Sequence, residues 1–269
     1  MSGINNILEN YIDKNIPDNE VAVLLSGGAD SLSLAFASHN LGKKVHAYNF
    51  YLDGDISYDT RKANIASSLF KWQITNVNVP RNNLKQDFKI LQKKYKCKKK
   101  TQYECTFPFL YIFPKIKQKY VLSGIAADGW YGVSKRAMIN FREPKELFDK
   151  FRNDYFGATN PAGILQQRQL AEEYNKILVH PYLWVKDIKD FFMQYSHKEL
   201  HIGTQKSHIK KAYKEYFNKI GNVKGHLNLQ LISGIDKLFE TLLYDKEINF
   251  KNRKRVMDIC RDWAVWEMQ

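Results

Sequence analysis

Residues 26 to 31, Ser-Gly-Gly-Ala-Asp-Ser, combine the residue types that bind phosphate groups. Glycine has no Cβ and readily adopts positive φ, so the backbone N–H groups of the two glycines can approach a ligand closely. A helix that begins there directs its N-terminal dipole and its unpaired N–H groups at the same point. The serines supply hydroxyl groups, and Asp30 supplies a carboxylate suited to a hard cation such as Mg²⁺. The stretch predicts a cradle for a phosphate-bearing ligand.

The elements on either side of this loop must hold it in place. The apolar run 21–25 predicts a strand buried on both faces, and residues 30–40 predict a helix that ends at Gly42. Strand and helix patterns then alternate, which predicts an α/β fold with a doubly wound parallel sheet and a ligand at the carboxyl ends of its strands. The other expected strands are 44–51, 75–79 and 120–122, and the other expected helices are 4–16, 57–69 and 107–117.

From residue 144 onward the pattern is mostly helical. We expect helices at 145–156, 163–174, 185–195 and 205–220. The predicted division is an α/β core with an N-terminal helix in residues 1–143 and a helical part in residues 144–269. No linker separates them, so one continuous domain is an open alternative. In the helix at 57–69 we expect Tyr58, Ile65 and Leu69 on the buried side.

Composition excludes several classes of protein. The chain has 269 residues, of which 44% are hydrophobic and 14% aromatic, as in a globular protein. No apolar run approaches the roughly 20 residues of a membrane span, and the N-terminus does not resemble a signal peptide. Three cysteines without a CxxC pair indicate neither a disulfide framework nor zinc. We therefore expect a cytoplasmic protein without a membrane partner.

The net charge of +14 favours anionic partners. Residues 93–100, KKYKCKKK, concentrate this charge, and Tyr95 and Tyr103 are candidates for stacking on nucleic-acid bases. We prefer to interpret this stretch as a solvated loop. Binding of nucleic acid stays open.

The loop belongs to neither of two common phosphate-binding motifs. GxxxxGK followed by Ser or Thr does not occur in the chain, nor does the dinucleotide fingerprint GxGxxG. SGGADS after a first strand instead resembles the signature of the PP-loop ATP pyrophosphatases. These enzymes cleave ATP between its α and β phosphates and leave AMP on an oxygen of the substrate.

Three further stretches resemble the synthetase domain of the asparagine synthetases, in the order of that family. CTFPFLYIFPKIKQKYVLSGIAADGWYG, from Cys105 to Gly132, resembles its lead-in, strand and SGxGADExFGG loop. NPAGILQQRQLAEEYNKILVHPYL resembles the helix and RVPFLD segment that follow, and TQKSHIKKAY resembles the start of the lysine-bearing helix. The resemblance extends over residues 17–220 and implies the adenine nucleotide α-hydrolase-like fold.

The resemblance also implies a role for each matching residue. ATP and Mg²⁺ are the implied cofactors, and Asp128 and Lys206 are the implied catalytic residues. The implied partners of the pyrophosphate end of ATP are Ser26, Gly27, Gly28 and Ser31. The nucleoside would be lined by Ser123 and Gly124, with Leu24 and Phe50 beside the adenine. The implied ligands of Mg²⁺ are Asp30 and Asp128.

The sequence departs from the asparagine synthetase pattern in two ways. Too few residues precede the first strand to hold a glutaminase domain, so we expect a separate source of ammonia or another amine. Ile125 and Gly129 stand where the family has glutamates, one of which assists attack by nitrogen, so we expect a different acceptor step. Two further candidates are His180, which could titrate near neutral pH, and Cys105, which could be a nucleophile. For both, a structural role is the preferred interpretation.

The function that fits these observations is an adenylating ligase that activates a substrate oxygen with ATP and then forms a C–N bond. Its acceptor would be a small molecule or a nucleotide. Two alternatives are open: a PP-loop enzyme that modifies a base in tRNA or DNA, and a nucleotide-binding scaffold without catalysis. The oligomeric state is not predicted.

Overall fold

The computed structural model describes residues 3–53, 56–97, 100–157, 163–183 and 185–221. At its centre lies a five-stranded, wholly parallel sheet in the order β3-β2-β1-β4-β5. The strands are β1 (Glu20–Leu24), β2 (Lys44–Leu52), β3 (Gln73–Val79), β4 (Tyr120–Ser123) and β5 (Ile177–Val179). This arrangement confirms the predicted α/β class with a doubly wound parallel sheet.

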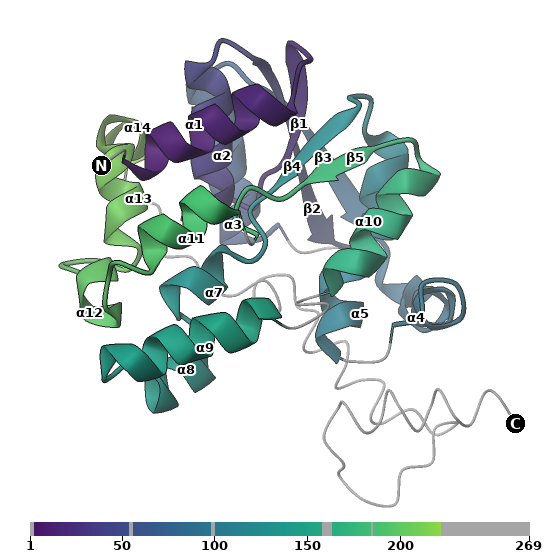
Figure 1. Cartoon of the computed structure of the whole chain (residues 1–269). Coiled ribbons are helices and arrows are strands. Elements are labelled where there is room, and N and C mark those ends of the chain that lie inside the picture. Colours follow the sequence, from purple (N-terminus) through teal and green to yellow (C-terminus); the bar gives the residue numbers. More distant parts are fainter. Residues whose placement is uncertain (1–2, 54–55, 98–99, 158–162, 184, 222–269) are drawn as a thin grey trace, which may run out of the picture.

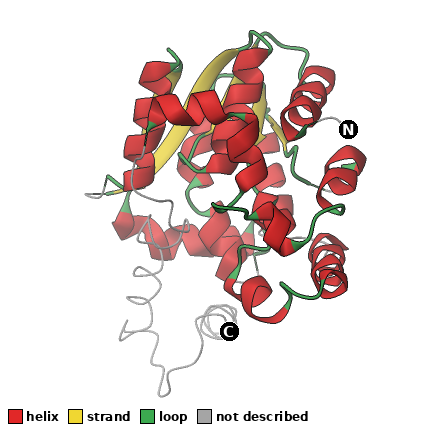
Figure 2. Ribbon diagram, turned by 90° about the vertical axis from the view of Figure 1, so that its left-hand side faces the viewer, coloured by secondary structure: helices red, strands yellow, loops and turns green. Residues whose placement is uncertain are grey.

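Helices cover both faces of the sheet (Figures 1 and 2). The α-helices are α1 (Ile4–Asn15), α2 (Ala29–Asn40), α3 (Tyr58–Leu69), α4 (Leu84–Lys93), α5 (Lys100–Thr106), α6 (Phe109–Ile112), α7 (Ala127–Tyr131), α8 (Lys135–Asn140), α9 (Lys145–Gly157), α10 (Ile164–Glu173), α11 (Lys186–Phe192), α12 (His197–Leu200), α13 (Ser207–Ala212) and α14 (Lys214–Ile220). Two short 3-10 helices are η1 (Arg81–Asn83) and η2 (Phe113–Lys115). In the part of the chain that the structure describes, no helix has the length and apolar character needed to cross a bilayer.

Strand β1 shows why the central strands read as continuous apolar runs. Val21 and Val23 belong to one hydrophobic cluster, and Ala22 belongs to the cluster on the opposite face. Side chains alternate between the faces of a strand, so a strand covered on both sides must be apolar at every position.

The sheet places the Ser26–Ser31 loop at its topological switch point. Strand β1 pairs with β2 on one side and with β4 on the other. The chain continues from β1 to β2 and from β4 to β5, on opposite sides of this pair, and ligands of such sheets bind at the carboxyl ends of the strands at this point. Both loops begin with Ser-Gly, at Ser26 and at Ser123.

The C-terminal part of the chain contributes to this same sheet. Strand β5, which the sequence patterns did not predict, lies beyond residue 144 and pairs with β4. Two expected helices are also interrupted. Residues 107–117 form α6 and η2, and residues 205–220 form α13 and α14 with a break at Tyr213.

The predicted buried face of α3 is wrong. Tyr58, Ile65 and Leu69 are 53%, 39% and 49% exposed, whereas small residues such as Ala63 and Ala66 are buried. Helix α3 packs closely on the Ser26–Ser31 loop, and the small residue Ala63 lies at that contact.

Candidate active site

The Ser26–Ser31 loop joins β1 to α2 at the carboxyl edge of the sheet. Gly27 has a φ of +77°, whereas Gly28 has a φ of −72° and is the N-cap residue of α2. Of the two glycines in the loop, Gly27 adopts the positive φ that glycine permits, and Gly28 does not. A helix N-cap residue has β-region backbone, which is what Gly28 adopts.

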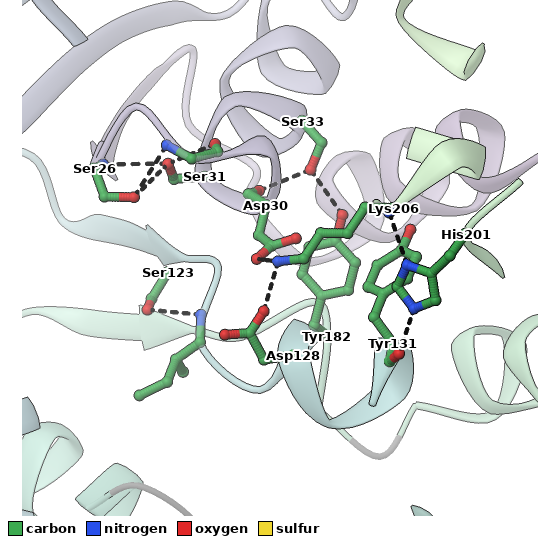
Figure 3. Close-up of polar contacts among 12 residues, drawn as sticks. Ser26, Asp30, Ser31, Ser33, Ser123, Asp128, Tyr131, Tyr182, His201 and Lys206 are labelled. Atoms are coloured by element: carbon green, nitrogen blue, oxygen red, sulfur yellow. Dashed lines mark hydrogen bonds and ion pairs between the residues drawn. The ribbon is translucent and has the colours of Figure 1, made fainter. Parts of the chain in front are cut away.

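The two serine hydroxyls close the loop into a turn (Figure 3). Ser26 Oγ and Ser31 Oγ are 3.1 Å apart, and the backbone N–H of Ser26 donates to Ser31 Oγ at 3.1 Å. The N–H of Gly28 donates to Ser26 Oγ at 3.3 Å. These bonds fix the backbone of the loop at the start of α2, where N–H groups favour an anion.

Gly27 also packs directly against α3. A Cβ at this position would lie 2.7 Å from the carbonyl oxygen of Asp59 and 3.1 Å from Cβ of Lys62. Any side chain at Gly27 would therefore face both an unfavourable φ and a collision with the backbone.

We expect the substitution Gly27→Val to abolish binding of Mg-ATP and to lower the free energy of unfolding by about 1–3 kcal/mol. The matched control is Gly42→Val, because Gly42 has a φ of +71° but nothing within 4 Å of its Cβ position. Titration calorimetry and thermal unfolding measure the two effects. ATP binding by Gly27→Val at the wild-type affinity would contradict the expectation.

The loop after β4 lies against the start of α2. A Cβ on Gly124 would be 3.0 Å from both the carbonyl carbon of Asp30 and the backbone nitrogen of Ser31. Ser123, the last residue of β4, is buried, and Asp128 lies in the first turn of α7. The two Ser-Gly loops thus meet, and each places one aspartate at the carboxyl ends of the strands.

Lys206 joins these two aspartates (Figure 3). Its Nζ lies 2.5 Å from Asp30 Oδ2 and 2.5 Å from Asp128 Oδ1. The side chain of Lys206 is only 6% exposed, while those of Asp30 and Asp128 are 15% and 59% exposed. Three residues that are far apart in the sequence therefore form one charged cluster.

The charge of Lys206 depends on the two carboxylates. Burial acts to lower the pKa of this amine, but Asp30 and Asp128 outweigh it, so the pKa is raised above its ordinary value of 10.5. Lys206 is thus a fixed cation at physiological pH. Such a preorganised charge in a buried site can stabilise negative charge that develops on a ligand.

His201 holds the backbone of Lys206 in an unusual conformation. Lys206 has a φ of +58°, and its N–H donates to His201 Nδ1 at 3.2 Å. Because Nδ1 accepts, Nε2 carries the proton and donates to the carbonyl oxygen of Tyr131 at 2.8 Å. His201 was not predicted from the sequence, since no motif marks a histidine five positions before the lysine.

We expect His201→Leu to lower ATP turnover by about tenfold, because Lys206 would lose its support. His201→Asn should keep more activity, since its amide oxygen can replace Nδ1 as the acceptor. The main cause that lowers the pKa of His201 is burial, with smaller contributions from the nearby His197, Lys206 and His208. Protonation of Nδ1 should therefore reduce wild-type turnover only below pH 6.5.

Assays of turnover against pH test this expectation, and His46→Leu is the control. The ring of His46 lies on β2 and stacks on Tyr48, with centroids 4.5 Å apart. Equal turnover in His201→Leu and wild-type protein would exclude the supporting role.

Comparison with known proteins identifies the relatives of the chain. The sequence model of the asparagine synthase family matches residues 9–221, which include both Ser-Gly loops and Lys206. The chain belongs to the asparagine synthase family. The chain therefore also belongs to the PP-loop ATP pyrophosphatase superfamily. Its fold is the expected adenine nucleotide α-hydrolase-like fold, and the strand order of its sheet is 3-2-1-4-5.

Two solved structures resemble the chain at low identity. One is a predicted subunit of tRNA methyltransferase from Methanocaldococcus jannaschii, with 16% identity, a TM-score of 0.36, and coverage of 73% of this chain and 87% of that one. The other is NMN synthetase from Francisella tularensis, with 15% identity, a TM-score of 0.38, and coverage of 83% and 96%. Neither likeness bears on function. No curated protein sequence matches the chain significantly.

Members of the asparagine synthase family generally use ATP and Mg²⁺, and two aspartates of this chain suit the metal. Asp30 and Asp128 present carboxylate oxygens, which Mg²⁺ prefers, and they already share one cation in Lys206 Nζ. The described residues contain no group of three or more His, Cys, Asp and Glu side chains that could bind a metal. Mg²⁺ is commonly bound by one or two carboxylates, with phosphate and water completing its shell.

Leu24 and Phe50, the predicted neighbours of adenine in the family, lie on adjacent strands near the carboxyl edge. Leu24 is the last residue of β1, and Phe50 lies close to the end of β2. Both are partly buried against the hydrophobic cluster on the α4–α6 side of the sheet. They form an apolar surface, and their role beside adenine stays a prediction.

Cys105 and His180 have the structural roles that we preferred. Burial, with a contribution from Glu104, raises the pKa of Cys105 to about 12, so its thiol is not an activated nucleophile. His180 is buried, and burial is the main cause that lowers its pKa to about 3. The suggestion that His180 titrates near neutral pH is therefore wrong.

The two tyrosines near the lysine-rich stretch 93–100 are not available to stack on nucleic-acid bases. Tyr95 and Tyr103 are buried in the hydrophobic core, so the suggestion that they stack on bases is wrong. Their hydroxyls are also engaged, because Tyr95 donates to Glu173 and Tyr103 to the carbonyl oxygen of Cys97, each at 2.8 Å. Residues 98–99 of the lysine-rich stretch lie outside the described residues.

Proposed function

We propose that the protein is an AMP-forming ligase that uses ATP to activate an oxygen of its substrate and then forms a C–N bond. The observation that carries the proposal is the cluster in which Lys206 Nζ bonds Asp30 and Asp128, each at 2.5 Å, beside the Ser26–Ser31 loop. Membership of the asparagine synthase family supports the same reaction class.

In the first step, a substrate oxygen attacks the α-phosphorus of ATP. A bond forms between them, the bond from the α-phosphorus to the bridging oxygen of the β-phosphate breaks, and pyrophosphate leaves with that electron pair. Ser26, Gly27, Gly28 and Ser31 bind the pyrophosphate end at the start of α2, in a loop whose shape is held by hydrogen bonds to its two serine hydroxyls. Lys206 stabilises the charge that accumulates on the phosphates. Ser123 and Gly124 line the nucleoside.

Asp30 and Asp128 would hold Mg²⁺. When bound, the ion would neutralise negative charge on the phosphate oxygens. For the carboxylates to accept it, the ammonium of Lys206 must release them and turn toward the phosphates. Lys206 would thus exchange a carboxylate partner for a phosphate partner, both anionic, so its buried charge keeps a counter-ion.

In the second step, an amine attacks the activated carbon, and AMP leaves with the electrons of the C–O bond. We propose that the amine comes from free ammonia, an amino compound or a separate protein that supplies ammonia. Ile125 is partly exposed and cannot accept a proton, so the base in this step must be another group or the substrate itself.

Identification of the nucleotide products tests the proposal. The full chain is incubated with Mg-ATP alone and then with aspartate plus ammonia, with nucleotides, with tRNA or with DNA. We expect AMP and pyrophosphate, and the additive that raises their rate names the acceptor class. Stimulation by tRNA or DNA would favour base modification instead of a small acceptor. ADP and phosphate would refute the reaction class, and tight ATP binding without turnover would indicate a scaffold.

A further inference from the structure

Lys62 is a cation beside the Ser26–Ser31 loop that no motif in the sequence marks. It lies in the second turn of α3, and its Cβ would be 3.1 Å from a Cβ on Gly27. Gly27 is the loop residue with positive φ, so α3 reaches the loop at the point where its backbone turns. Lys62 therefore comes from the helix that packs most closely on the predicted phosphate cradle.

The ammonium of Lys62 lacks a carboxylate partner within the described part of the chain. Its side chain is partly buried, and no acidic group there lies at ion-pair distance. Burial is the main cause that lowers the pKa of Lys62, Lys210 adds to it, and Asp59 opposes it. A partly buried charge without an ion pair is costly, so such a position favours an anionic ligand.

Lys210 extends the same arrangement from another element. Its backbone N–H donates to the carbonyl oxygen of Lys206 at 3.2 Å, which places it one helical turn after Lys206. Its Nζ bonds Thr204 Oγ1 at 2.7 Å. Burial lowers the pKa of Lys210, and so does Lys206. Lys62 on α3 and Lys210 on α13 therefore repel each other, and Lys206 also repels Lys210.

We propose that Lys62 binds the terminal phosphates of ATP and the pyrophosphate that is released, a role that rests on the ATP-cleaving function proposed above. Pyrophosphate carries several negative charges on two phosphorus centres. The start of α2 favours part of this charge, and the ammonium of Lys62 can supply a charge-assisted hydrogen bond to the rest. Lys206 remains available for the α-phosphate, where the bond is broken.

Titration of the full chain with inorganic pyrophosphate and with AMP, each in the presence of Mg²⁺, tests the proposal. We expect Lys62→Met to weaken pyrophosphate binding by about tenfold or more and to leave AMP binding unchanged, because AMP has no terminal phosphates. Methionine keeps an unbranched side chain against Gly27, and thermal unfolding checks that the fold is intact. Lys62→Arg should recover most of the pyrophosphate affinity. Lys14→Met, at an exposed lysine in the last turn of α1, is the matched control.

The outcomes separate this inference from the proposed function. If the wild-type protein binds pyrophosphate and AMP, and Lys62→Met binds both equally well, the inference fails and the ligase proposal stands. If the wild-type protein binds neither compound, both fail. A loss of AMP and pyrophosphate binding by the same factor in Lys62→Met would also overturn the inference, because it would indicate a general distortion of the loop.

Discussion

Replacing Lys206 with methionine will abolish ATP cleavage, with a fall in turnover on the order of 10³-fold. Methionine removes the buried cation that bonds both Asp30 and Asp128. We therefore also expect lower stability, by about 3 kcal/mol, since one partner of a buried ion pair is lost. A divalent cation should take the place of the ammonium in this variant.

Titration with Mn²⁺ in the absence of nucleotide, followed by paramagnetic resonance, measures that replacement. We expect Lys206→Met to bind Mn²⁺ and to unfold at a higher temperature with the ion, whereas wild-type protein should show weaker binding because Lys206 competes for both carboxylates. Lys14→Met should behave as wild type. Stronger Mn²⁺ binding by wild-type protein than by Lys206→Met would contradict the competition.

The raised pKa of Lys206 fixes the pH range of its contribution to stability. The pKa in the folded state lies above the ordinary value of 10.5. The stabilisation is therefore fully present below that ordinary value and is lost as the pH rises through the folded pKa. The cluster stays intact across the neutral range, where the enzyme would work.

Replacing either aspartate with asparagine will lower ATP cleavage by about 10²–10³-fold, with different costs in stability. Asp30 is 15% exposed, so Asp30→Asn should cost about 1–3 kcal/mol, with Asp128 still bonded to Lys206. Asp128 is 59% exposed, and solvent screens its interaction, so Asp128→Asn should cost about 1 kcal/mol or less. Denaturant unfolding and product assays measure both effects.

Asp13→Asn, in the exposed part of α1, is the control for these variants. Cleavage of ATP at the wild-type rate by Asp30→Asn would refute the metal role of this residue. Equal losses of stability in Asp30→Asn and Asp128→Asn would refute the argument from burial.

Much of the fold could be predicted because its strongest signals are local. Strand β1 reads as one apolar run, and α1 carries buried Ile4, Leu8 and Ile12 at helical spacing. Strand β5 was not predicted because it has only three residues, which are too few to show the periodicity of a strand.

The face of α3 shows where local pattern fails. Bulky residues such as Ile65 and Leu69 would normally mark the buried side of a helix. Here the helix approaches Gly27 closely, with Ala63 at the contact, and the bulky residues lie outside. The neighbour determines which face is buried, and a sequence does not reveal that neighbour.

Some residues of the candidate site could be predicted from the sequence, and others could not. Asp30, Asp128 and Lys206 were found because each lies in a stretch that resembles a known family, and the structure brings all three together. His201 and Lys62 lie outside those motifs and act through tertiary contacts, with the backbone of Lys206 and with Gly27. Only the folded chain reveals them.

The distance in sequence between Asp30 and Lys206 bears on how the protein is made. The two residues are 176 positions apart, yet they share one hydrogen bond. During synthesis the Ser26–Ser31 loop leaves the ribosome long before the lysine exists, so a nascent chain carries both carboxylates without their cation. Contacts of such large sequence separation form late in folding. A newly made chain should therefore gain its affinity for nucleotide in a single late event, after α13 has docked against α1 and α2.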